Sequence, residues 1–116
     1  MQVLLNTDNN IDGTEALTDY VEGVVTESLS RYAPHLTRVE VHLSDGSAGR
    51  STGDDIRCLL EARPAGGSPH TVSHYASVVD DALSGALHKL NRVLETASGK
   101  LDDRQGDLAA GGAEQA

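Results

Sequence analysis

The sequence contains no tryptophan and no phenylalanine, and three tyrosines are its only aromatic side chains. A hydrophobic core in this chain must therefore be aliphatic, built from Val, Leu, Ile and Ala. The single cysteine, Cys58, excludes an internal disulfide and a zinc site built on cysteines. No apolar run approaches the roughly 18 residues of a membrane-spanning helix, and the first residues do not resemble a signal peptide. We expect a soluble, cytoplasmic protein with no membrane partner.

Basic residues are scarce as well, with 9 Lys and Arg against 18 Asp and Glu and a net charge of −9. This excess of negative charge disfavours loose attraction to polyanions. A length of 116 residues predicts one domain with its own core. We place that domain at residues 1–98 and expect a disordered acidic tail at 99–116, because the tail is rich in Gly, Ala and Asp and has only two leucines.

The segment 77–97 has the clearest periodicity. Apolar residues recur along it, among them Leu83, Leu87, Leu90 and Leu94, at the i, i+3, i+4, i+7 spacing of an amphipathic helix. Ser77 suits an N-cap, and the acids of the first turn suit the helix dipole. The polar face is mixed in sign, whereas a helix that binds nucleic acid unaided is normally basic along its length.

The remaining elements follow from shorter patterns. Asp12 with Glu15 predicts a capped helix start, and Pro34 predicts its end after Tyr32. Strands are expected at 2–6, 37–44, 55–63 and 70–75, with a long hairpin loop at 45–54. The order β-α-β-β-β-α predicts an α+β fold of two layers, a four-stranded mixed sheet with both helices packed on one face.

Candidate side chains on the predicted strands also have structural explanations. Alternation places four basic residues and two acids on one outward face: Arg38, His42, Arg57, Arg63, Glu40 and Glu61. We therefore expect cross-strand ion pairs there and only a secondary basic surface. Tyr20, Tyr32 and Tyr75 are candidates for base stacking, but packing at the edge of the core explains them better.

Metal and catalytic sites are not expected. His70 and His74 share a strand face about 13 Å apart, too far to bind one ion. Cys58 falls on an inward face, and the adjacent acids Asp54-Asp55 and Asp80-Asp81 point apart. We predict no metal, no cofactor and no catalytic residue, and hence no enzyme.

Four segments together resemble the ribosome hibernation-promoting factor family, which includes the sigma-54 modulation or S30EA-type proteins. They are MQVLLNTDNNIDGTEALTDYVE, LTRVEVHLSD, GSPHTVSHYAS and ALSGALHKLNRVLE, and the resemblance spans about residues 1–98. It implies the same β-α-β-β-β-α fold in a short-form stress factor. Such a factor binds the small ribosomal subunit and inhibits translation by occlusion, without chemistry. Lys89 and Arg92 match the family's K-L-x-R stretch, and Arg31 matches a basic position more loosely.

The chain also departs from the family pattern. Glu22 and Glu27 stand where the first helix of the family carries lysines, and residues 96–99 replace a lysine-rich helix end. Lys89 and Arg92 also suit the negative end of a helix dipole. The alternative is an acidic protein-interaction or regulatory module of the same fold that has lost ribosome binding. We expect no DNA partner and a monomer, and a dimer through a sheet edge stays open.

Overall fold

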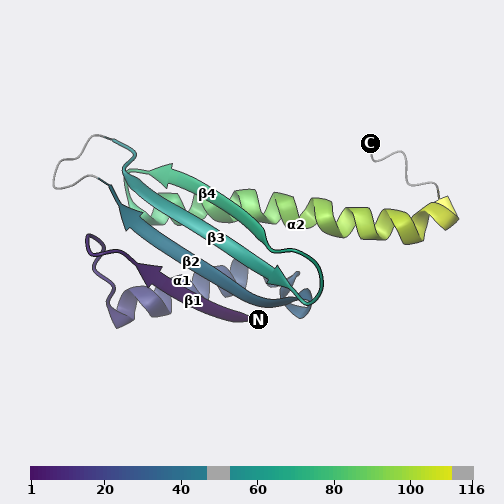
Figure 1. The fold of residues 1–116 in the computed structure, drawn as a ribbon, viewed down its shortest axis with the longest axis horizontal. Helices are drawn as coiled ribbons and strands as arrows, with labels where there is room; N and C mark the ends of the chain where they lie inside the picture. Colours follow the sequence, from purple (N-terminus) through teal and green to yellow (C-terminus); the bar gives the residue numbers. More distant parts are fainter. Residues whose placement is uncertain (47–52, 111–116) are drawn as a thin grey trace.

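In the computed structural model, four strands form one layer and two long helices form the other (Figure 1). The structure describes residues 1–46 and 53–110, with side chains described up to residue 97. The elements in chain order are β1 (Gln2–Thr7), α1 (Glu15–Ser28), the 3-10 turn η1 (Ala33–His35), β2 (Leu36–Asp45), β3 (Ile56–Pro64), β4 (His70–Ala76) and α2 (Val79–Ala110). The predicted fold class and element order are confirmed. No helix within the described residues is long and apolar enough to cross a membrane.

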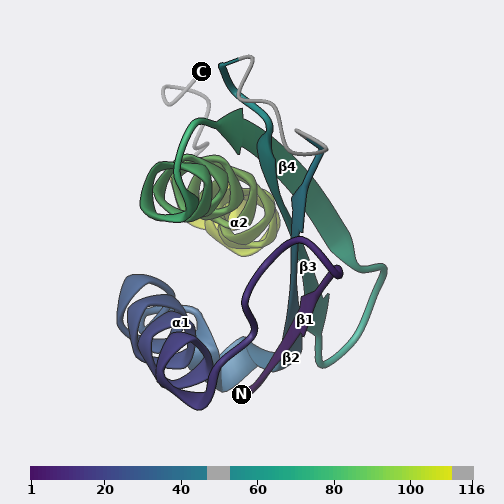
Figure 2. The ribbon, with the colours of Figure 1, turned by 90° about the vertical axis from the view of Figure 1, so that its left-hand side faces the viewer.

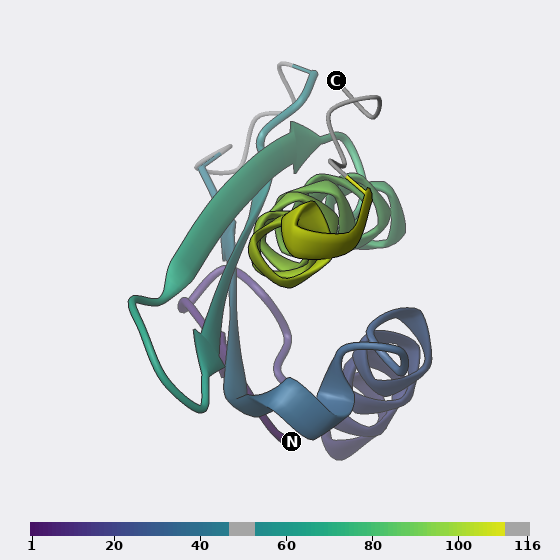
Figure 3. The ribbon, with the colours of Figure 1, turned by 90° about the vertical axis from the view of Figure 1, so that its right-hand side faces the viewer.

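The sheet has the order β1-β2-β3-β4, with β1 parallel to β2 and the other neighbours antiparallel. The predicted alternation of inward and outward side chains is observed in β2 and β3. Val39, Val41 and Leu43 of β2 are buried, as are Cys58 and Leu60 of β3. Both helices cover this face, and among the described elements none covers the opposite, bare face of the sheet (Figures 2 and 3). Residues 47–52 of the predicted hairpin loop lie outside the described residues.

Each helix covers a different part of the sheet. Helix α1 contacts β1, whereas α2 packs on β3 and β4. The buried side chains of α2 are those that the helical period predicted: Ala82, Leu83, Ala86, Leu87, Leu90 and Leu94. Burial of a Leu side chain contributes about 1.5–3 kcal/mol, so this stripe is a main source of stability. The core is aliphatic apart from Tyr32 and Cys58.

The ends of the helices differ from the sequence prediction. Thr14, not Asp12, caps α1: its Oγ1 accepts a hydrogen bond from the Leu17 amide at 3.1 Å. The helix ends at Ser28 rather than Tyr32, because Leu29 and Tyr32 both turn into the core. Pro34 instead lies in η1.

An N-cap at Ser77 would start the last helix at Val78, but α2 begins one residue later, at Val79. The helix runs far beyond Ala97, to Ala110 (Figure 1). Residues after Gly99 include Lys, Leu, Arg and Gln, which have good helix propensity and extend a helix that is already nucleated. The part of the expected tail at 111–116 lies outside the described residues.

Candidate nucleic-acid interface

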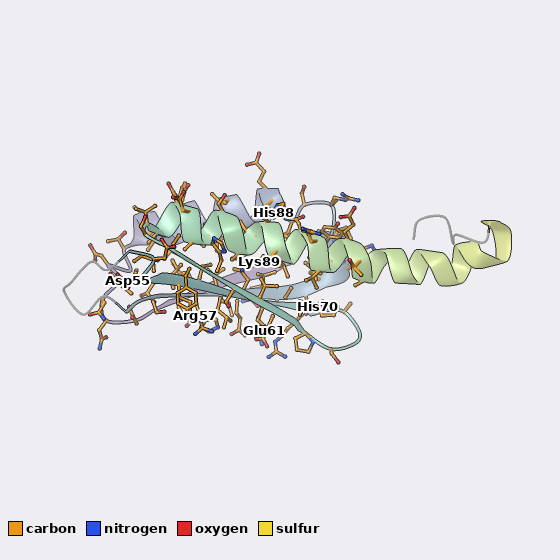
Figure 4. The ribbon with its side chains drawn as sticks, turned by 90° about the horizontal axis from the view of Figure 1, so that it is seen from above. Asp55, Arg57, Glu61, His70, His88 and Lys89 are labelled. Carbon is orange, nitrogen blue, oxygen red and sulfur yellow. The ribbon has the colours of Figure 1, made fainter. Side chains whose placement is uncertain are left out.

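Lys89 projects from α2 towards the edge of the sheet. Its Nζ donates a hydrogen bond to the backbone carbonyl of Ser73 in β4, at 2.8 Å (Figure 4). The partner is neutral, and no acid in the described part of the chain forms an ion pair with the ammonium. The side chain also places a charge over the exposed edge strand, which is a common protection against edge-to-edge pairing.

The other two predicted contacts are exposed as well. Arg92 is exposed on α2, and Arg31 is exposed in the turn after α1, where its guanidinium lies 5.1 Å from the centroid of the Tyr32 ring. Lys89 and Arg92 are three residues apart on α2, so they are neighbours on the surface of that helix. Arg31 is not part of α2 and comes from the turn that follows α1.

The outer surface of α1 is acidic. Its exposed charges are all carboxylates: Glu15, Asp19, Glu22 and Glu27. Within the described residues none of these four forms an ion pair. This surface continues into a groove between the helices, lined by Val24, Glu27, Ser28, Ser84, Leu87, His88 and Asn91. On the α1 side of the helical layer, this negative surface repels an approaching polyanion.

Two polar bridges join the two helices, and the second of them lies in that groove. The Tyr20 hydroxyl donates to Asp80 Oδ1 at 2.7 Å, and Asn91 Nδ2 donates to Ser28 Oγ at 3.0 Å. The hydrogen bond to the Asp80 carboxylate raises the pKa of Tyr20, because ionisation of the phenol would remove the donated proton. The bridges fix the spacing of two helices that otherwise touch little.

The outward face of β2 and β3 carries the predicted secondary basic surface. Arg38 and Arg63 oppose each other across the two strands, and in the next row Glu40 opposes Glu61. The expected cross-strand ion pairs are therefore wrong. The pairs run along the strands instead, with Arg38 to Glu40 at 3.0 Å and Arg63 to Glu61 at 3.4 Å. His42 Nε2 also approaches Glu40, at 3.4 Å.

Arg57 differs from the other two arginines of this face, because it makes no ion pair within the described residues. Its guanidinium instead lies 5.9 Å from the centroid of the Tyr75 ring, on the neighbouring β4. Tyr75 is 54% exposed and Tyr20 is 49% exposed, so the expected packing at the edge of the core holds for Tyr32 alone. The alternation of β4 was the available signal, since it places Tyr75 outward with Ser73 and Thr71.

The candidate metal ligands His70 and His74 and the candidate nucleophile Cys58 all lie on the covered side of the sheet. His70 and His74 oppose Ala62 and Cys58, on the face covered by α2. No group of three or more metal-ligating side chains gathers among the described residues. Cys58 is fully buried, and this burial raises the pKa of its thiol to about 12, so the nucleophilic thiolate does not form at neutral pH.

Residues 6–102 match the family model described as sigma 54 modulation protein / S30EA ribosomal protein. The chain belongs to this family. The resemblance seen in the sequence is thereby confirmed, and the family description names no enzyme. No curated protein matches the sequence.

Two solved structures share the S30EA-family fold seen here. The N-terminal domain of Protein Y from Thermus thermophilus superposes with a TM-score of 0.65 at 23% identity, covering 83% of this chain and 98% of that one. A ribosomal subunit interface protein from Coxiella burnetii superposes with a TM-score of 0.61 at 14% identity, covering 85% and 99% of the two chains. At identities this low, the structural similarity establishes a common fold and nothing more.

Proposed function

We propose that this protein is a ribosome-associated hibernation factor that binds the small ribosomal subunit and inhibits translation by occlusion. The observation that carries the proposal is the family match over residues 6–102, together with a complete two-layer fold. The similarity to a ribosomal subunit interface protein supports the same partner. The factor acts by occupying a site, without a cofactor and without bond chemistry.

The proposed contacts on the helical layer are Lys89 and Arg92, with Arg31 at the end of α1. The charges of Lys89 and Arg92 are both available, because neither forms an ion pair within the described residues. Each cation that neutralises an RNA phosphate releases condensed counterions, so binding should weaken steeply as salt rises. The basic residues of the sheet face, Arg38, His42, Arg57 and Arg63, form a second surface for the same partner.

Cosedimentation of the purified protein with small subunits and with whole ribosomes, at two salt concentrations, tests the function. We expect roughly stoichiometric pelleting with small subunits that falls as salt rises. An RNA-free basic protein serves as the control for charge attraction alone. Absence of pelleting with small subunits at low salt would contradict the proposal.

A matched pair of double variants tests the contacts. Lys89→Gln with Arg92→Gln removes two positive charges, and Ala16→Glu with Thr26→Glu adds two negative charges at exposed positions of α1. Both variants have the same net charge. We expect only the first to lose affinity, with a salt slope smaller by about two. Equal losses in both would mean that net charge alone matters, and no loss in either would remove Lys89 and Arg92 from the interface.

The acidic face of α1 favours a second candidate, a protein-interaction module that has lost ribosome binding. Carboxylates without cationic partners suit a basic protein segment. A labelled lysine-rich peptide, titrated against wild type and against Asp19→Asn with Glu22→Gln, tests this reading. Tight binding that the double variant abolishes, in a protein that does not pellet with ribosomes, would favour the module over the hibernation factor.

A further inference from the structure

The two faces of the molecule differ in charge. The outward face of the sheet carries three arginines, Arg38, Arg57 and Arg63, against two carboxylates, Glu40 and Glu61, an excess of one positive charge. Helix α1 carries four carboxylates and no basic residue, in a chain with a net charge of −9. A polyanion therefore meets less repulsion at the bare face of the sheet than at the α1 side of the helical layer.

Within this face and among the described residues, Arg57 has no ion pair and Tyr75 has no hydrogen bond. The other two arginines are bound by carboxylates of their own strands, at 3.0 and 3.4 Å. Within the described residues the Arg57 guanidinium forms no ion pair, and it lies over the Tyr75 ring, 5.9 Å from the centroid. Tyr75, directly opposite in the register, has a half-exposed ring with no hydrogen-bond partner in the described part of the chain. Figure 4 shows Arg57 and Glu61 on the side of the sheet away from α2.

We infer that the Arg57–Tyr75 pair binds an unpaired nucleotide of RNA, with the base stacked on the Tyr75 ring and a phosphate on the Arg57 guanidinium. The inference rests on the proposed function and gives that function a specific contact. An exposed aromatic ring on a sheet offers a stacking surface to any splayed base. A guanidinium beside it offers paired donors to a phosphate oxygen.

The composition of the face favours nucleic acid over a protein partner. Apart from Tyr75, only Leu4 and Leu59 bring apolar side chains to it among the described strand residues, and both are half-buried. Protein interfaces normally have an apolar, well-packed centre in which charged residues are depleted. Here the centre is two rows of opposed like charges, Arg38 with Arg63 and Glu40 with Glu61. Such a surface suits a hydrated, charged ligand.

The experiment uses the full chain and a 5′-labelled single-stranded oligouridylate of about eight nucleotides, within the usual site size of single-strand binders. Anisotropy titrations compare wild type with Tyr75→Leu, Tyr75→Phe and Arg57→Gln. We expect Tyr75→Leu to weaken binding about fivefold or more and Tyr75→Phe, which keeps the ring, to bind like wild type. Arg57→Gln should weaken binding and lower the salt slope by about one.

Tyr20→Phe is the matched control, because Tyr20 is 49% exposed but lies on the helical layer. It should bind like wild type. The chain has no tryptophan, so its intrinsic emission comes from tyrosine. In Tyr20→Phe, with Tyr32 buried, quenching of that emission by the oligonucleotide reports stacking on Tyr75.

The outcomes separate the inference from the proposed function. Wild-type affinity in both Tyr75→Leu and Arg57→Gln would overturn the inference, as would a preference for duplex RNA of the same length, even if cosedimentation with small subunits is intact. Loss of affinity in both variants, without pelleting of the wild type, would support the inference and refute ribosome binding. Circular dichroism of each variant confirms folding, and Tyr75→Phe separates loss of the ring from loss of structure.

Discussion

At the scale of single residues, the contact between Gly85 and His74 shows how closely α2 approaches β4. A Cβ built on Gly85 would lie 2.1 Å from Cδ2 of His74 and 2.6 Å from its Cγ. The imidazole thus occupies the space that any other residue at position 85 would fill. Glycine normally destabilises a helix relative to alanine, by about 1 kcal/mol. At this position the packing requires it.

We predict that Gly85→Ala destabilises the protein by about 1–3 kcal/mol, because the half-buried ring of His74 must move. Thermal or urea unfolding measures the effect. The double variant Gly85→Ala with His74→Ala should recover much of the loss, since the added methyl group then has room. Gly23→Ala is the control, because a Cβ there meets nothing within 4 Å and should be neutral or stabilising.

Cys58 gives a prediction about pH. Burial raises the pKa of its thiol from 9.0 to about 12, so between these values the unfolded chain loses the proton and the folded chain keeps it. The stabilising term is complete below pH 9 and disappears as pH rises towards 12. From pH 8 to pH 10.5, wild type should lose roughly 2 kcal/mol more stability in urea unfolding than Cys58→Ala. Equal losses in the two proteins would show that the thiol does not couple to folding.

Single-residue roles were predictable only where they depend on local pattern. Alternation placed Cys58 inward and Arg57 outward, and both predictions are confirmed. The close approach of Gly85 to His74 depends on how α2 is set against β4, which no periodicity encodes. The ion pairs along the strands were also missed, because they depend on rotamers and on the pairing of Arg38 with Arg63 after a register shift in β2.

At the scale of elements, the structure shows which of two candidate residues caps the start of α1. Asp12 and Thr14 are both residues of N-cap type, and only Thr14 accepts the Leu17 amide. We predict that Thr14→Ala lowers stability by about 0.5–2 kcal/mol, because an amide of the first turn loses its partner. Asp12→Ala is the matched control and should change stability far less. Chemical unfolding of both variants decides; a larger effect at Asp12 would contradict the observed cap.

Periodicity predicted the existence and type of every strand and both long helices, but not their limits. The apolar stripe of α2 continues to Leu94 and Ala97, yet the helix runs to Ala110. Once a helix is established, each further backbone hydrogen bond fixes only one more residue, so the end of the predicted apolar stripe is not the end of the helix. Conversely, α1 ends before its apolar pattern does, because Leu29 and Tyr32 reach the core from a turn.

At the scale of the whole molecule, the layer arrangement separates charges that the sequence intermingles. The parallel β1–α1–β2 unit and the position of α2 after β4 place both helices on one face, and the bare face then receives the outward residues of all four strands. The fold could be predicted from this connectivity. The candidate interface could be predicted only in part: helical spacing makes Lys89 and Arg92 neighbours on α2, whereas Arg57 and Tyr75 meet only through the register of β3 with β4.

This separation predicts opposite effects of salt on folding and on binding. Glu15, Asp19 and Glu22 repel one another at i, i+3 and i, i+4 spacing on α1, and the net charge of −9 adds a general repulsion. Raising NaCl from about 0.01 M to about 0.15 M shortens the screening length from about 30 to 8 Å, and the melting temperature should rise. Asp19→Asn should melt higher than wild type at low salt and respond less to added salt. Over the same range affinity for small subunits should fall, because the cations that contact RNA are screened as well. A melting temperature that falls with salt would instead mean that the ion pairs of the sheet, Arg38 with Glu40 and Arg63 with Glu61, outweigh the repulsion on α1.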